Sequence, residues 1–240
     1  MKTKIILLTL FFMTIFGNIQ AQQGVDTLNV RQQDIVAIAA YTGKGDLEHL
    51  KSALAKGLDD GMTVNEIKEV LVHAYAYCGF PRSLRALQTF MAVIDERKAK
   101  GITDELGREA SPITDNRDKY ARGAEILSKL NGQPIDAPKA GYAEFAPIIE
   151  KFLKEHLFCD IFERDVLTYQ ERELATVSIL AAMGGVEPMA RGHIAICLHQ
   201  GITPGQVGQL LDIVGRSIGE AEAASVRKVL DELVKQSTKQ

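Results

Sequence analysis

Two stretches of the chain decide the fold: VNEIKEVLVHAYAYCG (residues 64–79) and TPGQVGQLLDIVGRSIG (residues 203–219). Both place apolar residues three and four positions apart, which is the period of an α-helix with one buried face. Thr63 and Thr203 stand where N-terminal caps are expected, and Gly79 and Gly219 close the two patterns. No stretch alternates between apolar and polar residues as a half-buried strand does. The sequence therefore predicts an all-α protein.

The two stretches lie 140 residues apart, and other features recur at the same interval. An offset of 139 fits the helix before them better, and it pairs Asp34 with Glu173. Gly and Thr residues recur in the same order between the apolar runs of the two stretches. This recurrence indicates a tandem duplication of one helical unit. We expect a first unit over residues 28–97, a joining segment over residues 98–140 and a second unit over residues 141–236, with the units packed face to face. The identical pairs are Gly45/Gly185, Ala55/Ala195, Leu58/Leu198, Gly61/Gly201, Thr63/Thr203, Leu71/Leu211 and Gly79/Gly219.

The first 21 residues are predicted to be a signal peptide. Lys2 and Lys4 precede an apolar run over residues 5–16, and a polar stretch then leads to Ala21. This order is typical of a secretory signal. The run is short for a membrane span, which needs about 20 residues, although an uncleaved anchor is the alternative. We expect a secreted or periplasmic protein with no membrane contact after cleavage.

The composition of the 240 residues excludes several classes of function. A net charge of -3 gives no general attraction to nucleic acid, and the absence of Trp removes the usual stacking platform for bases and sugars. The chain has no HExxH pattern, no repeated Cys/His spacing and no phosphate-binding loop after a strand. We therefore expect a small-molecule ligand and neither a metal nor a cofactor.

The three cysteines, Cys78, Cys159 and Cys197, have no CxxC spacing, and an odd number cannot all pair within one chain. One interpretation is three small buried side chains. The other is a single reactive or intermolecular thiol, for which Cys78 is the best candidate.

Polar residues on one predicted helix of the first unit are candidates for chemistry. Glu66, His73 and Tyr77 share one helix face. A carboxylate and an imidazole there could exchange a proton or orient a substrate. A solvated polar face is the structural alternative.

A second set of candidates lies in the second unit. Glu173 stands near the start of an apolar helix, and His193 lies on the apolar side of the next helix. Arg172 and Arg191 are possible partners of that carboxylate or binders of a substrate carboxylate. A Glu–Arg pair that ties helices together is the structural alternative.

Residues 66–87 (EIKEVLVHAYAYCGFPRSLRAL) resemble the signature segment of the carboxymuconolactone decarboxylase family. In that family an E-I-x-E-x-L helix leads into a Y-x-G-x-P turn, here Tyr77, Gly79 and Pro81. The remaining family motifs are similar to three later segments, which are YARGAEILSKLNG (120–132), FCDIFERDVLTYQERE (158–173) and GGVEPMARGHI (184–194). The two copies together cover most of the chain after the signal peptide.

The resemblance implies an all-α fold, identical subunits in an oligomer and one of two chemistries. One branch of the family decarboxylates 4-carboxymuconolactone. The other, alkylhydroperoxidase D-like, reduces peroxides or disulfides through a CxxC followed by a His. Here that CxxC falls on Val186 and Met189, with His193 as the His, so both thiols are missing. Secretion argues against muconolactone itself, because breakdown of aromatic acids is expected inside the cell.

Each copy keeps the half of the family's site that the other has lost. Ala53 stands in the first copy where His193 stands in the second, and Ser217 stands in the second where Tyr77 stands in the first. We therefore expect one composite site. Its predicted members are Glu66, Tyr77, Cys78, Glu173 and His193.

The expected activity is a carboxy-lyase reaction on a small carboxylated lactone or ring compound. Arg164 or Arg191 would hold the carboxylate, and His193 would protonate the carbon left by CO2. Glu173 or Glu66 would tune His193. His73, Tyr77 and Cys78 complete the predicted substrate contacts.

Two alternatives to a decarboxylase remain open. One is a peroxiredoxin-like or alkylhydroperoxidase-like thiol activity through Cys78, weakened by the missing CxxC. The other is a non-catalytic oligomeric binding module. In each case we expect a homo-oligomer, a trimer or a hexamer, because long apolar helix faces need a partner surface.

Overall fold

The computed structural model describes residues 26–138 and 141–237, so the predicted signal peptide lies outside the described residues. These residues form helices and no strand, which confirms the all-α prediction. No helix among them is long and apolar enough to span a bilayer. The helices are α1 (Val30–Lys44), α2 (Leu47–Asp59), α3 (Val64–Ala99), α4 (Lys119–Asn131), α5 (Tyr142–Phe145), α6 (Pro147–Phe152), the π-helix η1 (Leu153–Ile161), α7 (Tyr169–Met183), α8 (Glu187–His199), α9 (Pro204–Ser217) and α10 (Glu220–Ser237).

The duplication appears as two sets of four helical segments. Gly79 interrupts α3 with φ 80° and ψ 161°, so α3 consists of two arms, residues 64–78 and 80–99. The Ser83 hydroxyl donates to the Leu71 carbonyl at 2.7 Å and ties one arm to the other. α1, α2 and the two arms of α3 thus correspond to α7, α8, α9 and α10. The fourth segment of each set had not been assigned from the sequence.

Four capping boxes start equivalent helices in the two sets. Thr63 and Thr203 cap α3 and α9, as predicted. The equivalent boxes at α1 and α7 use Asn29 with Gln32 and Thr168 with Glu171. Each box satisfies backbone N–H groups that a helix leaves open at its first turn.

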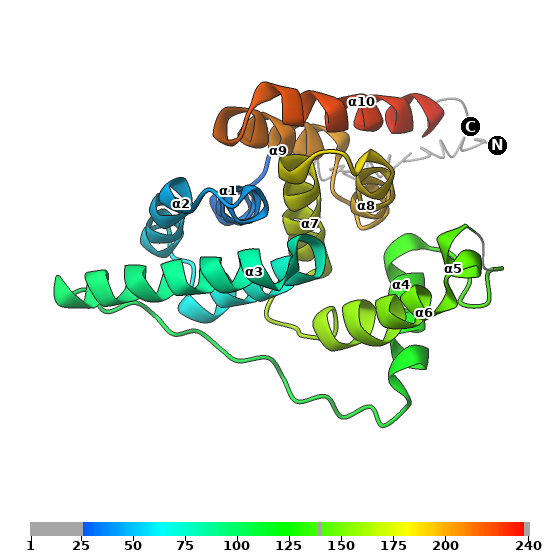
Figure 1. Ribbon diagram of the computed structural model, residues 1–240, viewed down its shortest axis with the longest axis horizontal. Helices are drawn as coiled ribbons and strands as arrows, with labels where there is room; N and C mark the ends of the chain where they lie inside the picture. Colours follow the sequence, from blue (N-terminus) through cyan, green and yellow to red (C-terminus); the bar gives the residue numbers. More distant parts are fainter. Residues whose placement is uncertain (1–25, 139–140, 238–240) are drawn as a thin grey trace, which may run out of the picture.

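The two sets pack crosswise, with α1 against α7 at the centre of the molecule (Figure 1). The first arm of α3 also contacts α7, and α9 contacts α1. The third segment of each set therefore lies against the first helix of the other set. Two hydrophobic clusters result, and each mixes residues of both sets. A site built at this junction draws its side chains from both copies.

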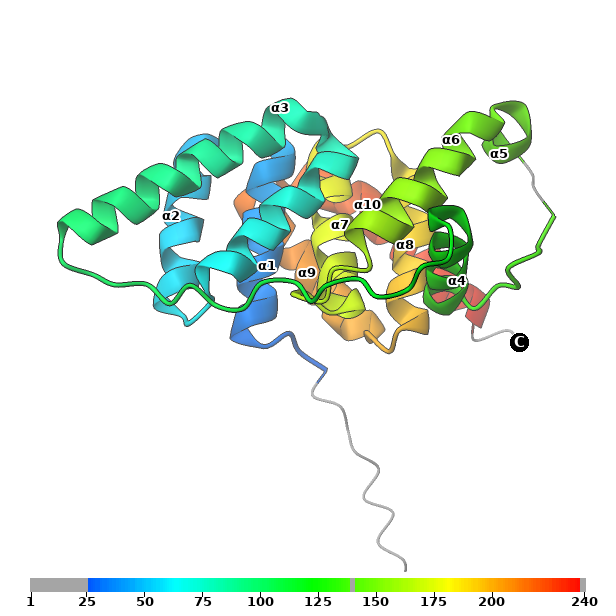
Figure 2. The ribbon, with the colours of Figure 1, turned by 90° about the horizontal axis from the view of Figure 1, so that it is seen from below.

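Residues 100–118, the first part of the joining segment, run as an extended strap along one side of the molecule from α3 to α4 (Figures 1 and 2). Backbone N–H groups of Val64 and Asn65 donate to the carbonyls of Glu105 and Leu106, both at 2.9 Å. The strap thereby satisfies two N–H groups at the start of α3 that the helix itself leaves open.

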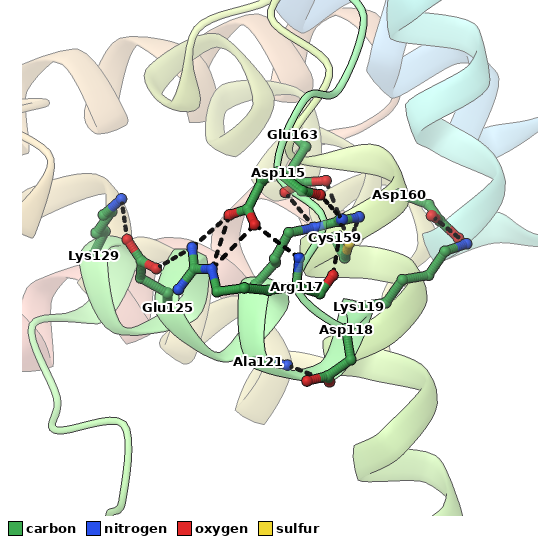
Figure 3. A network of polar contacts seen from close by, with 11 residues as sticks. Asp115, Arg117, Asp118, Lys119, Ala121, Glu125, Lys129, Cys159, Asp160 and Glu163 are labelled. Atoms are coloured by element: carbon green, nitrogen blue, oxygen red, sulfur yellow. Dashed lines mark hydrogen bonds and ion pairs between the residues drawn. The ribbon is translucent and has the colours of Figure 1, made fainter.

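Charged side chains fix the far end of the strap to α4 and η1 (Figure 3). Arg117 bonds Asp115 and pairs with Glu125 at 2.8 Å. Arg122 of α4 pairs with Glu163 at 3.0 Å and donates to the Cys159 sulfur of η1 at 3.1 Å. α4 and η1 enclose a third hydrophobic cluster, which also includes Ile196 of α8.

Candidate functional site

Tyr77 lies where the three hydrophobic clusters meet, and its ring packs against all of them. Its centroid is 5.2 Å from that of His73, one turn earlier on α3. The same ring meets that of His193 of α8 in a T-shaped contact, with centroids 5.4 Å apart. The crosswise packing thus brings a tyrosine of the first copy against a histidine of the second.

His193 and Glu173 form a hydrogen-bonded pair across α8 and α7. Nδ1 of His193 lies 2.8 Å from Oε2 of Glu173. The Glu173 side chain is fully buried, whereas that of His193 is 15% exposed. If Glu173 is ionised, its carboxylate accepts this hydrogen bond, Nδ1 carries the proton and Nε2 is the second functional nitrogen. Among the described residues, no hydrogen bond engages Nε2.

His73 is fully buried, and both of its ring nitrogens are engaged. Nδ1 lies 3.4 Å from Nη1 of Arg172, which can only donate, and Nε2 lies 2.9 Å from the Thr176 hydroxyl. The Thr176 hydroxyl in turn donates to the Arg172 carbonyl at 2.9 Å. Burial, and then the charge of Arg172, lower the pKa of His73 well below its ordinary value. His73 is therefore neutral, and Arg172 and Thr176 occupy both of its ring nitrogens, which are the atoms that the predicted substrate contact would use.

Glu69 is the buried carboxylate of α3, and the sequence analysis missed it. Its oxygens accept from Arg164 at 2.9 Å and from Arg172 at 2.8 Å. Burial opposes its ionisation, but the two arginines outweigh burial and hold the pKa of Glu69 below its ordinary value. Glu69 is the second acid of the E-I-x-E-x-L pattern and lies one turn before His73. That helical spacing is the sequence feature from which its place near His73 could have been predicted.

Three residues predicted for the site are placed elsewhere. Glu66 occupies the capping box of α3 and pairs with Arg31 at 2.6 Å. Arg164 is held by Glu69, which lies two turns, roughly 12 Å, before Tyr77 along α3. Arg191 pairs with Glu232 of α10. Each side chain is already paired with a nearby opposite charge, so neither arginine is directed at His193.

The cysteines are all free and do not favour thiol chemistry. The Cys78 thiol donates to the Ala74 carbonyl at 3.1 Å, and burial raises its pKa. Burial also raises the pKa of Cys159. Burial, and then the charge of Glu173, raise the pKa of Cys197 well above its ordinary value. All three sulfurs are therefore thiols at neutral pH, whereas the reactive form is the thiolate.

Three buried polar atoms of the site make no hydrogen bond within the described part of the chain. They are the Tyr77 hydroxyl, Oε1 of Glu173 and Nε of Arg172. Buried polar atoms are normally paired, so each unpaired one calls for an explanation, and a bound water molecule or ligand group is one such explanation. Elsewhere Asp34 Oδ2, Asn65 Oδ1 and Arg122 Nε are unpaired as well. The described residues contain no group of three or more His, Cys, Asp or Glu side chains placed to hold a metal ion.

The pseudo-equivalent position in the other half of the molecule lacks this chemistry. Asp34 occupies the place of Glu173, and its carboxylate pairs with Lys56 at 2.7 Å. Ala53 and Ser217 stand where the imidazole and the phenol would be. The chain therefore brings Tyr77, Glu173 and His193 together at one position only, across its two copies.

Comparison with known proteins gives one family. A family model described as the carboxymuconolactone decarboxylase family matches residues 11–90 and 147–232, which is more than half of the chain. The two matched regions include α1 to α3 up to residue 90 and α6 to α10 up to residue 232. No curated protein matches the sequence.

Proposed function

The chain belongs to the carboxymuconolactone decarboxylase family, and on that basis we propose that it is an acid/base enzyme. Its proposed reaction is a carboxy-lyase reaction on a small carboxylated lactone or ring compound. The hydrogen-bonded pair of His193 and the buried Glu173 is the observation that supports this proposal most directly.

The pair can hold and deliver a proton at one defined atom. Glu173 fixes the Nδ1–H tautomer of His193 and stabilises the imidazolium that forms when Nε2 takes up a proton. When the C–C bond to the carboxylate breaks, CO2 leaves its electron pair on the substrate. Nε2 then gives its proton to the carbon, and the imidazole recovers a proton from water.

A thiol peroxidase is less well supported than acid/base chemistry. Peroxide reduction needs a thiolate, and burial keeps Cys78, Cys159 and Cys197 protonated. Val186 and Met189 stand at the positions that carry the family's dithiol.

A substrate screen with two site variants tests the proposal. The purified chain is incubated with a panel of lactone and ring carboxylates, and loss of CO2 is followed by mass spectrometry. We expect His193→Gln to lower turnover about 10²- to 10⁴-fold, the usual contribution of a general acid. We expect Glu173→Gln to lower it as well, because the amide cannot stabilise the imidazolium.

His156→Gln is the matched control, because His156 is an exposed histidine of η1 that pairs with Asp160. It should leave turnover unchanged. An unchanged rate in His193→Gln would refute the assigned role. If no carboxylate in the panel is turned over, the result favours the binding-module alternative.

A further inference from the structure

The hydroxyl of Tyr77 is a buried donor that makes no hydrogen bond of normal geometry to any described residue. The Thr176 hydroxyl, which also contacts Nε2 of His73, is close enough to lower the pKa of Tyr77 but does not complete such a bond. Two fully buried neighbours on α7, Arg172 and Glu173, each carry an unpaired polar atom as well. Desolvating a hydroxyl without giving it a partner is unfavourable, and such groups in native proteins call for a bound group or a function. The three atoms come from one cluster of side chains, which points to a ligand there.

The protonation state of Tyr77 fixes what the hydroxyl can do. Burial, and then the charge of Glu173, raise the pKa of Tyr77 well above its ordinary value. The phenol is therefore protonated at neutral pH and acts as a hydrogen-bond donor. Its ring meets that of His193 in a T-shaped contact, with centroids 5.4 Å apart, so the Tyr77 side chain is a neighbour of any ligand bound at His193.

We propose that Tyr77 donates a hydrogen bond to the substrate oxygen that becomes negatively charged during decarboxylation. This inference rests on the proposed function. The bond between the ring carbon and the carboxylate breaks, CO2 leaves, and the electron pair passes into a ring carbonyl to give an enolate. Tyr77 stabilises the enolate oxygen. The pair then returns to the carbon as it takes the proton from Nε2 of His193, which regains one from water.

The step restricts the class of substrate. The electron pair left by CO2 needs an acceptor, and the proposed step uses a carbonyl of the substrate itself. The proposed substrates are therefore carboxylates placed so that this pair delocalises into a lactone or ketone carbonyl, directly or through a double bond. Tyr77 acts on the reacting atoms, and Glu173 acts through His193.

A stable enolate analogue provides the test. Tetronate, the ionised form of 4-hydroxy-2(5H)-furanone, is a lactone whose enolate oxygen is negatively charged at neutral pH, and γ-butyrolactone is its neutral counterpart. Binding of both to the full chain is measured by isothermal titration calorimetry. We expect Tyr77→Phe to weaken tetronate binding about 10- to 100-fold, as for loss of a hydrogen bond to a charged group, and lactone binding by less than about 3-fold.

The matched control is Tyr75→Phe, two residues earlier on the same arm, where the ring stacks on Phe80 with centroids 4.5 Å apart. It should bind tetronate like the wild type. Tyr77→Phe keeps the ring and removes only the unpaired hydroxyl, so its melting temperature should not fall. Loss of binding without loss of stability separates a ligand contact from a structural role.

Two results would overturn the inference: Tyr77→Phe binding tetronate as tightly as the wild type, or a wild type that does not prefer tetronate to the neutral lactone. The screen separates this failure from that of the proposed function. Turnover that is lost in His193→Gln but kept in Tyr77→Phe rejects the role of Tyr77 alone. Absence of turnover with every carboxylate rejects the proposed function and the inference with it.

Discussion

His73 shows at the scale of one residue how burial fixes a protonation state. Its pKa is lowered well below the ordinary value by burial first and by Arg172 second. Above pH 6.5 the histidine is neutral in both the folded and the unfolded chain. Below pH 6.5 only the unfolded chain takes up the proton, so stability falls with falling pH, by up to about 1.4 kcal/mol per pH unit from this group.

The pH dependence is checked by urea unfolding between pH 8 and pH 5. We expect the free energy of unfolding of His73→Gln to depend less steeply on pH below 6.5 than that of the wild type. His156→Gln removes an exposed histidine and should keep the wild-type slope. Equal slopes in the wild type and His73→Gln would contradict the assigned protonation state.

At the scale of elements, two glycines in helices face opposite surroundings. Gly123 of α4 lies against η1, and a Cβ there would be 1.8 Å from the Lys154 carbonyl oxygen. Gly192 of α8 has nothing within 4 Å of the same position. The first glycine permits the close approach of α4 and η1, whereas the second has no packing role.

Alanine substitutions at these positions should change stability in opposite directions. Gly123→Ala must move α4 away from η1, so we expect a loss of about 1–3 kcal/mol in the free energy of unfolding. Gly192→Ala should add about 0.5–1 kcal/mol, because alanine favours the helix and restricts the unfolded chain. Denaturant unfolding of both variants measures this, and a change of the same sign in both would contradict the packing account.

At the scale of the whole molecule, the protein exposes a group of large apolar side chains on α5 and α6. Phe145 is 92% exposed. An apolar surface of this kind often marks contact with another protein. The other exposed members are Tyr142, Ile148, Ile149 and Phe152.

We expect the chain to form a homo-oligomer, a trimer or a hexamer, and size-exclusion chromatography with light scattering measures its mass. Phe145→Ser should shift the mass towards the monomer if α5 and α6 form the contact. Ile113→Ser changes an exposed apolar residue of the strap and should not. A monomeric wild type across micromolar concentrations would contradict the expectation.

Secretion, with a mature chain that begins at Gln22, is a separate proposal, and N-terminal sequencing of the secreted protein tests it.

The sequence by itself determined the all-α class, the helices that begin at residues 64 and 204, and the duplication, because the signals for these features are local. The apolar period, the capping boxes at Thr63 and Thr203 and the glycine break at Gly79 each act over a few neighbouring residues. Comparing the copies also indicated that Tyr77 and His193 belong to complementary halves, since each lacks its counterpart at the repeat interval.

Only the tertiary structure decided which polar side chains meet. Glu66 and Glu69 are three residues apart on one helix, yet Glu66 caps its own helix and Glu69 binds Arg164 and Arg172. Which of the two carboxylates meets Arg172 depends on where α7 crosses α3. Long-range pairing of charges and rings is set by that crossing, because a side chain reaches only the neighbours that helix packing brings to it.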